Sequence, residues 1–189
     1  MVWDADPGGA YTPKAGYLFL SAGVELREEV WWWRPLCKLK CPAKTKLFMW
    51  CVLNNKVPTW DVLQKRTFQG LGWCVMCKRE LETTHHLFYT CSFSSAVWRE
   101  VSTLVGFNCQ WEGDSIGAAW ESWWRRTPQK HLKSLPLLVI SGIWLARNKA
   151  IFKDIPSLPA IIGSLAVGFY KYLPVHLRAA RERRKLEVA

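Results

Sequence analysis

The amino-acid sequence predicts a mostly α fold, in which a small helical domain containing a Cys/His loop is followed by a C-terminal helical segment. Apolar residues recur at helical spacing in several stretches, and no long alternating run of polar and apolar residues indicates a sheet. Three cysteines and two histidines fall within residues 74–91, where a bound metal ion would order a loop that buries little apolar surface. The 189 residues suffice for one domain or two small ones.

Three helices are predicted before the Cys/His loop. Residues 17–26 are suited to the first, which follows a stretch containing glycine and proline. The apolar run KLFMWCVLN at residues 46–54 is long enough for about two helical turns, and Pro58 ends it. Thr59 is a candidate N-cap for a short helix over residues 60–66, whose last turn carries the basic residues that the helix dipole favours.

Four helices are predicted after the Cys/His loop. The first three cover about residues 94–104, 115–126 and 132–152. The last begins near Ser157 and is expected to be interrupted at Pro174, because proline removes a helical hydrogen bond. The apolar runs at residues 135–146 and 158–170 are shorter than the roughly 20 residues needed to cross a bilayer, so buried helices are the better interpretation.

These elements divide the chain into four expected parts. They are an N-terminal loop, a domain that contains the Cys/His loop, a helical connector and a basic tail, at residues 1–16, 17–106, 107–174 and 175–189. The tail contains the basic run RAARERRK.

The charge of the chain favours a polyanionic partner. The formal net charge is +11, and residues 31–79 contain ten Lys/Arg but a single acid. A charged stretch is often only a solvated face, but this one leads directly into the Cys/His loop. We therefore expect largely sequence-independent binding to RNA or DNA, and no membrane partner. The residues predicted to contact nucleic acid are Lys38, Lys40, Lys44, Lys46, Lys65, Arg66, Lys78 and Arg79.

Thirteen tryptophans are far more than a chain of this length usually contains. Such large rings need deep burial or a stacking partner. Core packing is the better interpretation for Trp50 and Trp60. Trp31, Trp32 and Trp33 are consecutive, so they cannot all face inward on one helix, and one ring is expected to remain available for stacking on a base.

Seven cysteines, an odd number, are not preceded by a secretory signal pattern. We therefore expect free thiols in a reducing compartment, nuclear or cytoplasmic, and not a secreted protein. Four of the cysteines have no histidine nearby and are interpreted as small core residues. They are Cys37, Cys41, Cys51 and Cys109.

The remaining three cysteines have the spacing of a structural zinc site. Cys74 and Cys77 form a Cys-x2-Cys pair, and Cys91 closes the loop together with either His85 or His86. Zn²⁺ accepts three thiolates and one imidazole in a tetrahedral site, and four protein ligands leave no open position for catalysis. The sequence thus predicts a structural, zinc-knuckle-like CCHC loop. Spacing alone does not choose between the histidines, one of which is expected to be exposed or to contact Glu80 or Glu82.

The motifs resemble a known family. LKCPAKTKLFMWCVLNNKVPTWDVLQKR, then CVMC, ETTHHLFYTC and AVW, and later IWLARNKAIF, follow one another as in the zinc-binding region downstream of the reverse transcriptase in plant non-LTR (LINE-type) retrotransposons. The resemblance covers roughly residues 10–155 and implies that His86 is the ligand, in the pattern Glu-Thr-x2-His-Leu-Phe. Cys37 and Cys41 depart from the family, which more often has bulky apolar residues there.

The resemblance implies an accessory segment without an active site. The chain has no Asp-Asp pair of the kind a polymerase uses, and its acids are scattered rather than clustered as a ribonuclease H or endonuclease requires. It also lacks a phosphate-binding glycine loop and a Gly-x-Ser-x-Gly motif. We therefore expect no catalytic residues and no enzymatic activity.

Three functions remain open at this point. The first is a non-catalytic, zinc-stabilised nucleic-acid-binding module of a retrotransposon-derived reverse transcriptase polyprotein. The second is a helical interaction module that docks a polymerase domain, such as the reverse transcriptase, or another protein. The third is a fragment of a decayed element without a present role.

Overall fold

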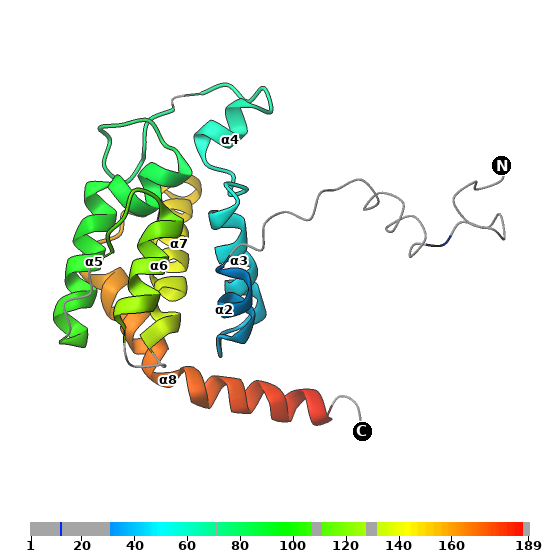
Figure 1. The fold of residues 1–189 in the computed structure, drawn as a ribbon. Helices are drawn as coiled ribbons and strands as arrows, with labels where there is room; N and C mark the ends of the chain where they lie inside the picture. Colours follow the sequence, from blue (N-terminus) through cyan, green and yellow to red (C-terminus); the bar gives the residue numbers. More distant parts are fainter. Residues whose placement is uncertain (1–11, 13–30, 71, 107–110, 128–131, 187–189) are drawn as a thin grey trace. The chain divides into compact units, whose positions relative to one another are not determined.

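The computed structural model comprises two compact units, Met1–Pro35 and Leu36–Ala189 (Figure 1). It describes residues 12, 31–70, 72–106, 111–127 and 132–186, with side chains as far as residue 172. The helix predicted at residues 17–26 and most of the loop predicted at 1–16 lie outside the described residues.

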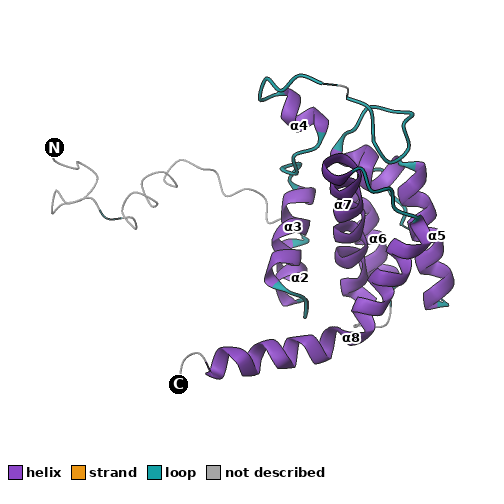
Figure 2. Cartoon of the chain, turned by 180° about the vertical axis from the view of Figure 1, so that it is seen from behind, coloured by secondary structure: helices purple, strands orange, loops and turns teal. Residues whose placement is uncertain are grey.

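All regular secondary structure in the described residues is helical, which confirms the predicted fold class (Figure 2). Outside the helices these residues form one isolated antiparallel bridge, between Trp73 and Leu81. In chain order the helices are α2 (Trp33–Lys38), α3 (Ala43–Leu53), α4 (Trp60–Gln64), the π-helical turn η1 (His86–Thr90), α5 (Ser92–Val105), α6 (Ile116–Arg126), the 3₁₀ turn η2 (Leu132–Ser134), α7 (Leu135–Lys153) and α8 (Pro159–Leu186).

Helix α7 is the central element of the second unit, where it contacts α3, α5 and α8. Leu135, Leu137, Val139, Ile140 and Ile143 are fully buried on it. A helix that is apolar on most sides is suited to such a position. Together with η2 this helix has 22 residues and is long and apolar enough to cross a membrane by length and composition alone, so the prediction that the apolar run is too short is wrong. Half of its most apolar stretch is buried inside the protein.

Two glycines allow α8 to pack closely. A Cβ atom at Gly163 would lie 2.8 Å from Cγ of Glu100 on α5 and 3.0 Å from its Cβ. A Cβ atom at Gly142 on α7 would lie 3.0 Å from a methyl group of Ile162. Because these glycines have no side chains, α8 can approach both α5 and α7 closely.

Tryptophans fill the space around α5 and α6. The ring of Trp98 stacks on Trp111 with centroids 4.6 Å apart, and Trp123 lies 5.7 Å from Trp98. The indole N–H of Trp123 donates a hydrogen bond to the carbonyl of Leu132 at 3.2 Å, which joins α6 to η2. In the first unit Trp32 is buried, whereas Trp31 and Trp33 are exposed.

One predicted feature of the last helix is wrong. The sequence indicates an interruption at Pro174, but α8 is continuous from Pro159 to Leu186. Helices accommodate an internal proline by bending, and Figure 1 shows that α8 bends along its length.

The predicted boundary between residues 106 and 107 falls within the second unit, where α5 and α8 contact each other. As a division of the chain into domains it stays a prediction.

Because α8 packs closely at Gly163 but not at Gly168, alanine substitutions at these two glycines should change the stability differently. Gly168→Ala meets no atom within 4 Å, so its gain in helix propensity should raise the free energy of unfolding by about 0.5–1 kcal/mol. Gly163→Ala gains the same propensity but displaces Glu100, and we expect a net loss of stability. Urea unfolding of both variants followed by circular dichroism measures the difference. Equal effects at the two positions would contradict the close contact between α5 and α8.

Candidate metal centre

The structure brings Cys74, Cys77, His86 and Cys91 together. Their candidate ligand atoms all lie within 4.8 Å of one another. The sulfurs of Cys74 and Cys91 are 3.9 Å apart, and the sulfur of Cys77 is 3.2 Å from Nε2 of His86. Tetrahedral coordination with Zn–S bonds of about 2.3 Å places two sulfurs about 3.8 Å apart, so the donor set fits Zn²⁺. Among the described residues, no other group of this kind meets the same criterion.

Backbone amides stabilise two of the candidate ligands as thiolates. Cys74 accepts hydrogen bonds from the backbone of Met76 and Cys77, and Cys91 accepts them from Phe93 and Ser94 in the first turn of α5. Positive partial charge at a helix N-terminus favours such an anion. A hydrogen bond from the Cys74 thiol lowers the pKa of the Cys91 thiol to about 5. The same contact, together with burial, raises the pKa of Cys74, so a cation is needed to hold both sulfurs deprotonated.

The two histidines have different environments. His86 is buried, and its Nδ1 lies 3.1 Å from both a carboxylate oxygen of Glu80 and the hydroxyl of Thr90. A carboxylate that accepts the Nδ1 proton leaves the lone pair of Nε2 directed at the metal. His85 is exposed, and its ring lies against Tyr89. The geometry therefore favours His86 over His85, as the family pattern implies.

The local sequence explains why His86 faces inward. The hydroxyl of Thr83 accepts a hydrogen bond from the backbone N–H of His86 at 2.9 Å, as an N-cap residue does. The π-helical turn η1 then places Leu87 and Phe88 in the core, where neither side chain is exposed. π-Helical turns of this kind are frequent at functional sites.

Phe88 anchors the Cys/His loop to the helical body through an aromatic cluster. Its ring centroid lies 6.2 Å from that of Phe48 on α3 and 6.4 Å from that of Trp144 on α7. Phe48 and Trp144 are themselves 5.8 Å apart. Aromatic pairs at these separations stabilise a fold by about 0.5–1.5 kcal/mol each beyond the area that they bury.

A buried ion pair forms a second connection to the helical body. Arg147 on α7 donates from Nε to one carboxylate oxygen of Glu82 at 3.1 Å and from Nη2 to the other at 2.5 Å. The two side chains are only 7% and 3% exposed. The guanidinium also lies over the ring of Trp144, 4.9 Å from its centroid. Glu82 and Arg147 are thus joined across 65 residues of sequence.

Glu82 also ties α4 to the Cys/His loop. Its side chain accepts a hydrogen bond from the backbone N–H of Trp60 at 3.2 Å, and its carbonyl accepts one from Asp61 at 3.3 Å. Thr59, the predicted N-cap, donates its hydroxyl proton to Asp61 at 2.6 Å, so Thr84 is the donor to Thr59 at 3.0 Å. These buried contacts hold α4 beside the metal centre.

The eight basic residues predicted to bind nucleic acid fall into two sets. Lys65, Arg66, Lys78 and Arg79 are exposed at the end of the unit where α4 and the Cys/His loop lie (Figure 1). Lys38, Lys40, Lys44 and Lys46 lie at the opposite end of α3, whose eleven residues span about 16 Å. Of these four, Lys46 donates to the carbonyl of Cys37 at 3.1 Å and so satisfies the end of α2. The sequence therefore missed both this structural role of Lys46 and the separation of the two sets.

The interpretation of the remaining cysteines as core residues is only partly right. Cys41 is buried, and desolvation raises its pKa to about 11. Cys51 is half-buried, and Cys109 lies outside the described residues. Cys37 is exposed, which contradicts the prediction, whereas the neighbouring Leu36 and Leu39 are buried.

The Glu82–Arg147 pair also escaped the sequence analysis, although both residues lie in motifs that were recognised. A single arginine within an apolar helix is the signal that points to a buried carboxylate, because an unpaired buried charge is strongly unfavourable.

Metal analysis tests the ligand assignment. We expect the purified chain to contain one zinc ion, and Cys74→Ser or His86→Ala to lose it because the tetrahedral set is then incomplete. His85→Ala is the matched control and should keep the metal. Elemental analysis of the three variants after dialysis against a weak chelator gives the stoichiometry. Zinc retained by His86→Ala and lost by His85→Ala would reverse the assignment.

Substitution of the buried ion pair tests its contribution to stability. Arg147→Met should lower the free energy of unfolding by about 3–5 kcal/mol, since it leaves the Glu82 carboxylate buried and unpaired. The double variant Glu82→Gln/Arg147→Met should recover part of this loss, because it removes both charges. Arg125→Ala breaks an exposed pair with Glu121 and serves as a control that should change stability by less than about 1 kcal/mol. Additive losses in the double variant would show that the two side chains do not interact.

Comparison with known proteins confirms the predicted resemblance. Residues 11–98 match the family described as zinc-binding in reverse transcriptase. A candidate ribonuclease H protein of Arabidopsis thaliana is 24% identical over 102 residues, which cover 53% of this chain and 16% of that relative. No solved structure matches the chain. The Cys₃His cluster and the family match agree on zinc as the metal. Residues 11–98 are therefore similar to the zinc-binding region that is associated with reverse transcriptases.

Proposed function

We propose that the zinc-binding loop and α4 form a nucleic-acid-binding surface, and that the chain is a non-catalytic accessory module of a retrotransposon-derived reverse transcriptase. The observation that carries this proposal is a pair of exposed aromatic rings among exposed cations beside the metal centre. Trp73 is 56% exposed and Phe68 is 58% exposed, although both belong to residue types that proteins usually bury. We expect such a module in a reducing compartment, nuclear or cytoplasmic, where the thiolates remain available to zinc.

The exposed ring of Trp73 extends from a tightly packed segment of the chain. Trp73 directly precedes the candidate ligand Cys74 and forms the bridge with Leu81. A Cβ atom at Gly72 would overlap the ring of Trp60, so α4 packs tightly beneath this position. A rigid exposed indole loses little conformational entropy when a base stacks on it, and such stacking contributes about 1–3 kcal/mol per base. This arrangement favours unpaired bases over a closed duplex.

The cations around the ring are suited to phosphates. Lys65, Arg66, Lys78 and Arg79 are all exposed, and Glu80 is the exposed acid between Cys77 and the buried Glu82. A zinc ion with three thiolates and one neutral imidazole has a net charge of about −1, so Lys78 and Arg79 also offset the charge of the centre itself. The experiment must therefore separate nucleic-acid binding from metal retention.

Titration of a fluorescein-labelled oligouridylate under increasing salt tests the proposal. With four phosphate contacts, the logarithm of the affinity should fall against the logarithm of salt with a slope of about −3 for a single strand. Lys78→Ala/Arg79→Ala should reduce that slope to about −1.5 while the zinc content stays at one ion. Trp73→Ala should weaken binding about 5- to 150-fold, as expected for the loss of one stacked base.

Phe152→Ala is the matched control, because Phe152 is an exposed aromatic residue on α7. It should bind the oligouridylate like the unchanged protein. Binding that is absent at low salt, or that is independent of salt, would reject the proposed surface. Equal losses in Trp73→Ala and Phe152→Ala would reject the stacking role of Trp73.

A helical interaction module is the second candidate function. Exposed apolar residues on α7 and α8 favour it, since Leu145 and Leu165 are 61% and 63% exposed. The two functions are compatible, because these residues lie on other elements than the cations of the zinc-binding loop.

A further inference from the structure

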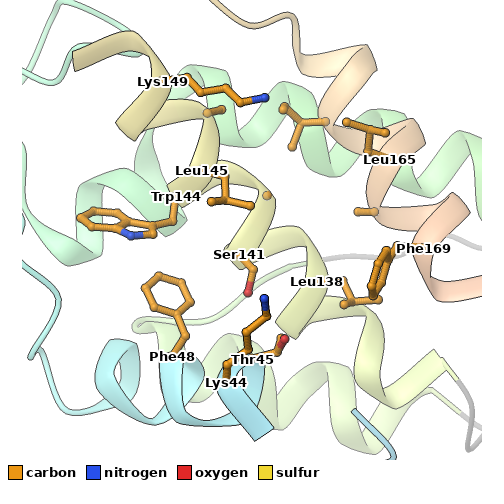
Figure 3. Close-up of a pocket in the computed structure, with 14 residues that line it drawn as sticks. Lys44, Thr45, Phe48, Leu138, Ser141, Trp144, Leu145, Lys149, Leu165 and Phe169 are labelled. Carbon is orange, nitrogen blue, oxygen red and sulfur yellow. The ribbon is translucent and has the colours of Figure 1, made fainter. Parts of the chain in front are cut away.

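A groove of about 530 Å³ runs along α7 between α3 and α8 (Figure 3). Helix α7 forms its floor with residues that recur at helical spacing, among them Leu138, Leu145 and Lys149. Phe48 on α3 and Leu165 on α8 belong to its two sides. The groove belongs to the second unit and does not include any candidate metal ligand.

The dimensions of the groove match a short helix. The stretch from Leu138 to Lys149 on its floor spans about 16 Å, which is the length of about three helical turns. Its surface is mainly apolar, and Leu145 and Leu165 remain more than half exposed in the described part of the chain. A groove between two helices with an apolar floor is a recurrent binding site for an amphipathic helix, whose residues at i, i+3, i+4 and i+7 insert as anchors.

The charges around the groove indicate which residues should flank the apolar face of the bound helix. Lys44 and Lys149 line the groove and both are exposed, and among the described side chains no acidic residue lines it. Figure 3 shows the two lysines on different elements, Lys44 on α3 and Lys149 on α7. Acidic groups on a partner would therefore meet a cation from either element. A second copy of this chain is disfavoured as the occupant, because each copy has a formal net charge of +11.

We propose that this groove binds an amphipathic helix of another protein, about three turns long, whose apolar face is flanked by acidic residues. The partner is thus defined by its chemistry, and the proposal does not depend on nucleic-acid binding by the zinc-binding loop. The loss of one function leaves the other intact.

Fluorescence anisotropy of the zinc-loaded full chain with synthetic peptides tests this proposal. The probes are labelled helical 14-residue peptides with Leu, Ile or Phe at the four anchor positions and Glu on both flanks, and a matched set with Lys in place of Glu. We expect at least one acidic-flanked peptide to bind, and its Lys-flanked counterpart to bind at least about tenfold more weakly.

Two pairs of variants locate the binding site. Leu145→Ser/Leu165→Ser should weaken binding of the acidic-flanked peptide about tenfold or more, whereas Leu47→Ser/Phe152→Ser should leave it unchanged. Leu47 and Phe152 are 62% and 76% exposed but do not line the groove, so the control removes a comparable apolar surface. Lys149→Glu should weaken binding, and Lys153→Glu at the end of the same helix should not. Unfolding midpoints of all variants check that the fold is retained.

Four outcomes would overturn the proposal. They are the absence of binding by every acidic-flanked peptide, equal binding of the two peptide sets, equal losses in the groove and control variants, and displacement of the peptide by oligouridylate. Self-association that Leu145→Ser/Leu165→Ser abolishes would also overturn it, because a second copy would then occupy the groove. Apart from displacement by oligouridylate, none of these results bears on oligouridylate binding or on its salt dependence, so the two proposals fail separately.

Discussion

The ion pair between Glu82 and Arg147 determines how the zinc-binding loop is attached to the helices. Metal coordination orders the loop internally, but it does not fix the loop on the rest of the molecule. The bidentate contact does so, because its geometry permits one orientation of the guanidinium against the carboxylate. Glu82 also accepts from the backbone of Trp60, so one buried side chain joins the loop, α4 and α7.

Apolar packing of a residue of η1 reinforces that attachment. The rings of Phe88, Phe48 and Trp144 each lie close to the other two, and Trp144 also contacts Arg147. Because Trp144 takes part in both connections, the polar and apolar contacts depend on the same turn of α7. The positions of the metal ligands are therefore coupled to the packing of a helix that begins more than forty residues after Cys91 in the sequence.

Sequence patterns predicted the helices and the ligands better than the contacts between them. Gly106 and Asp154, both with positive φ, end α5 and α7 where the periodic pattern stops, because the left-handed conformation terminates a helix. The Cys-x2-Cys pair was visible because its ligands are close in sequence. His85 and His86 were indistinguishable by spacing, since the choice depends on the cap at Thr83. The Glu82–Arg147 contact lies between two motifs far apart in sequence. An arginine within an apolar helix indicates a buried acidic partner, but it does not identify Glu82 as that partner.

Arg147 lies outside the segment that matches the family, although its partner Glu82 lies inside it. The family match ends at residue 98, within α5, and excludes both α7 and α8. A protein excised at that boundary would lack the guanidinium that neutralises Glu82 and the helices that cover α5 and η1. The matched segment is thus shorter than the set of residues that buries Glu82 and covers α5. Exchange of residues 11–98 alone between related chains would separate Glu82 from its partner Arg147.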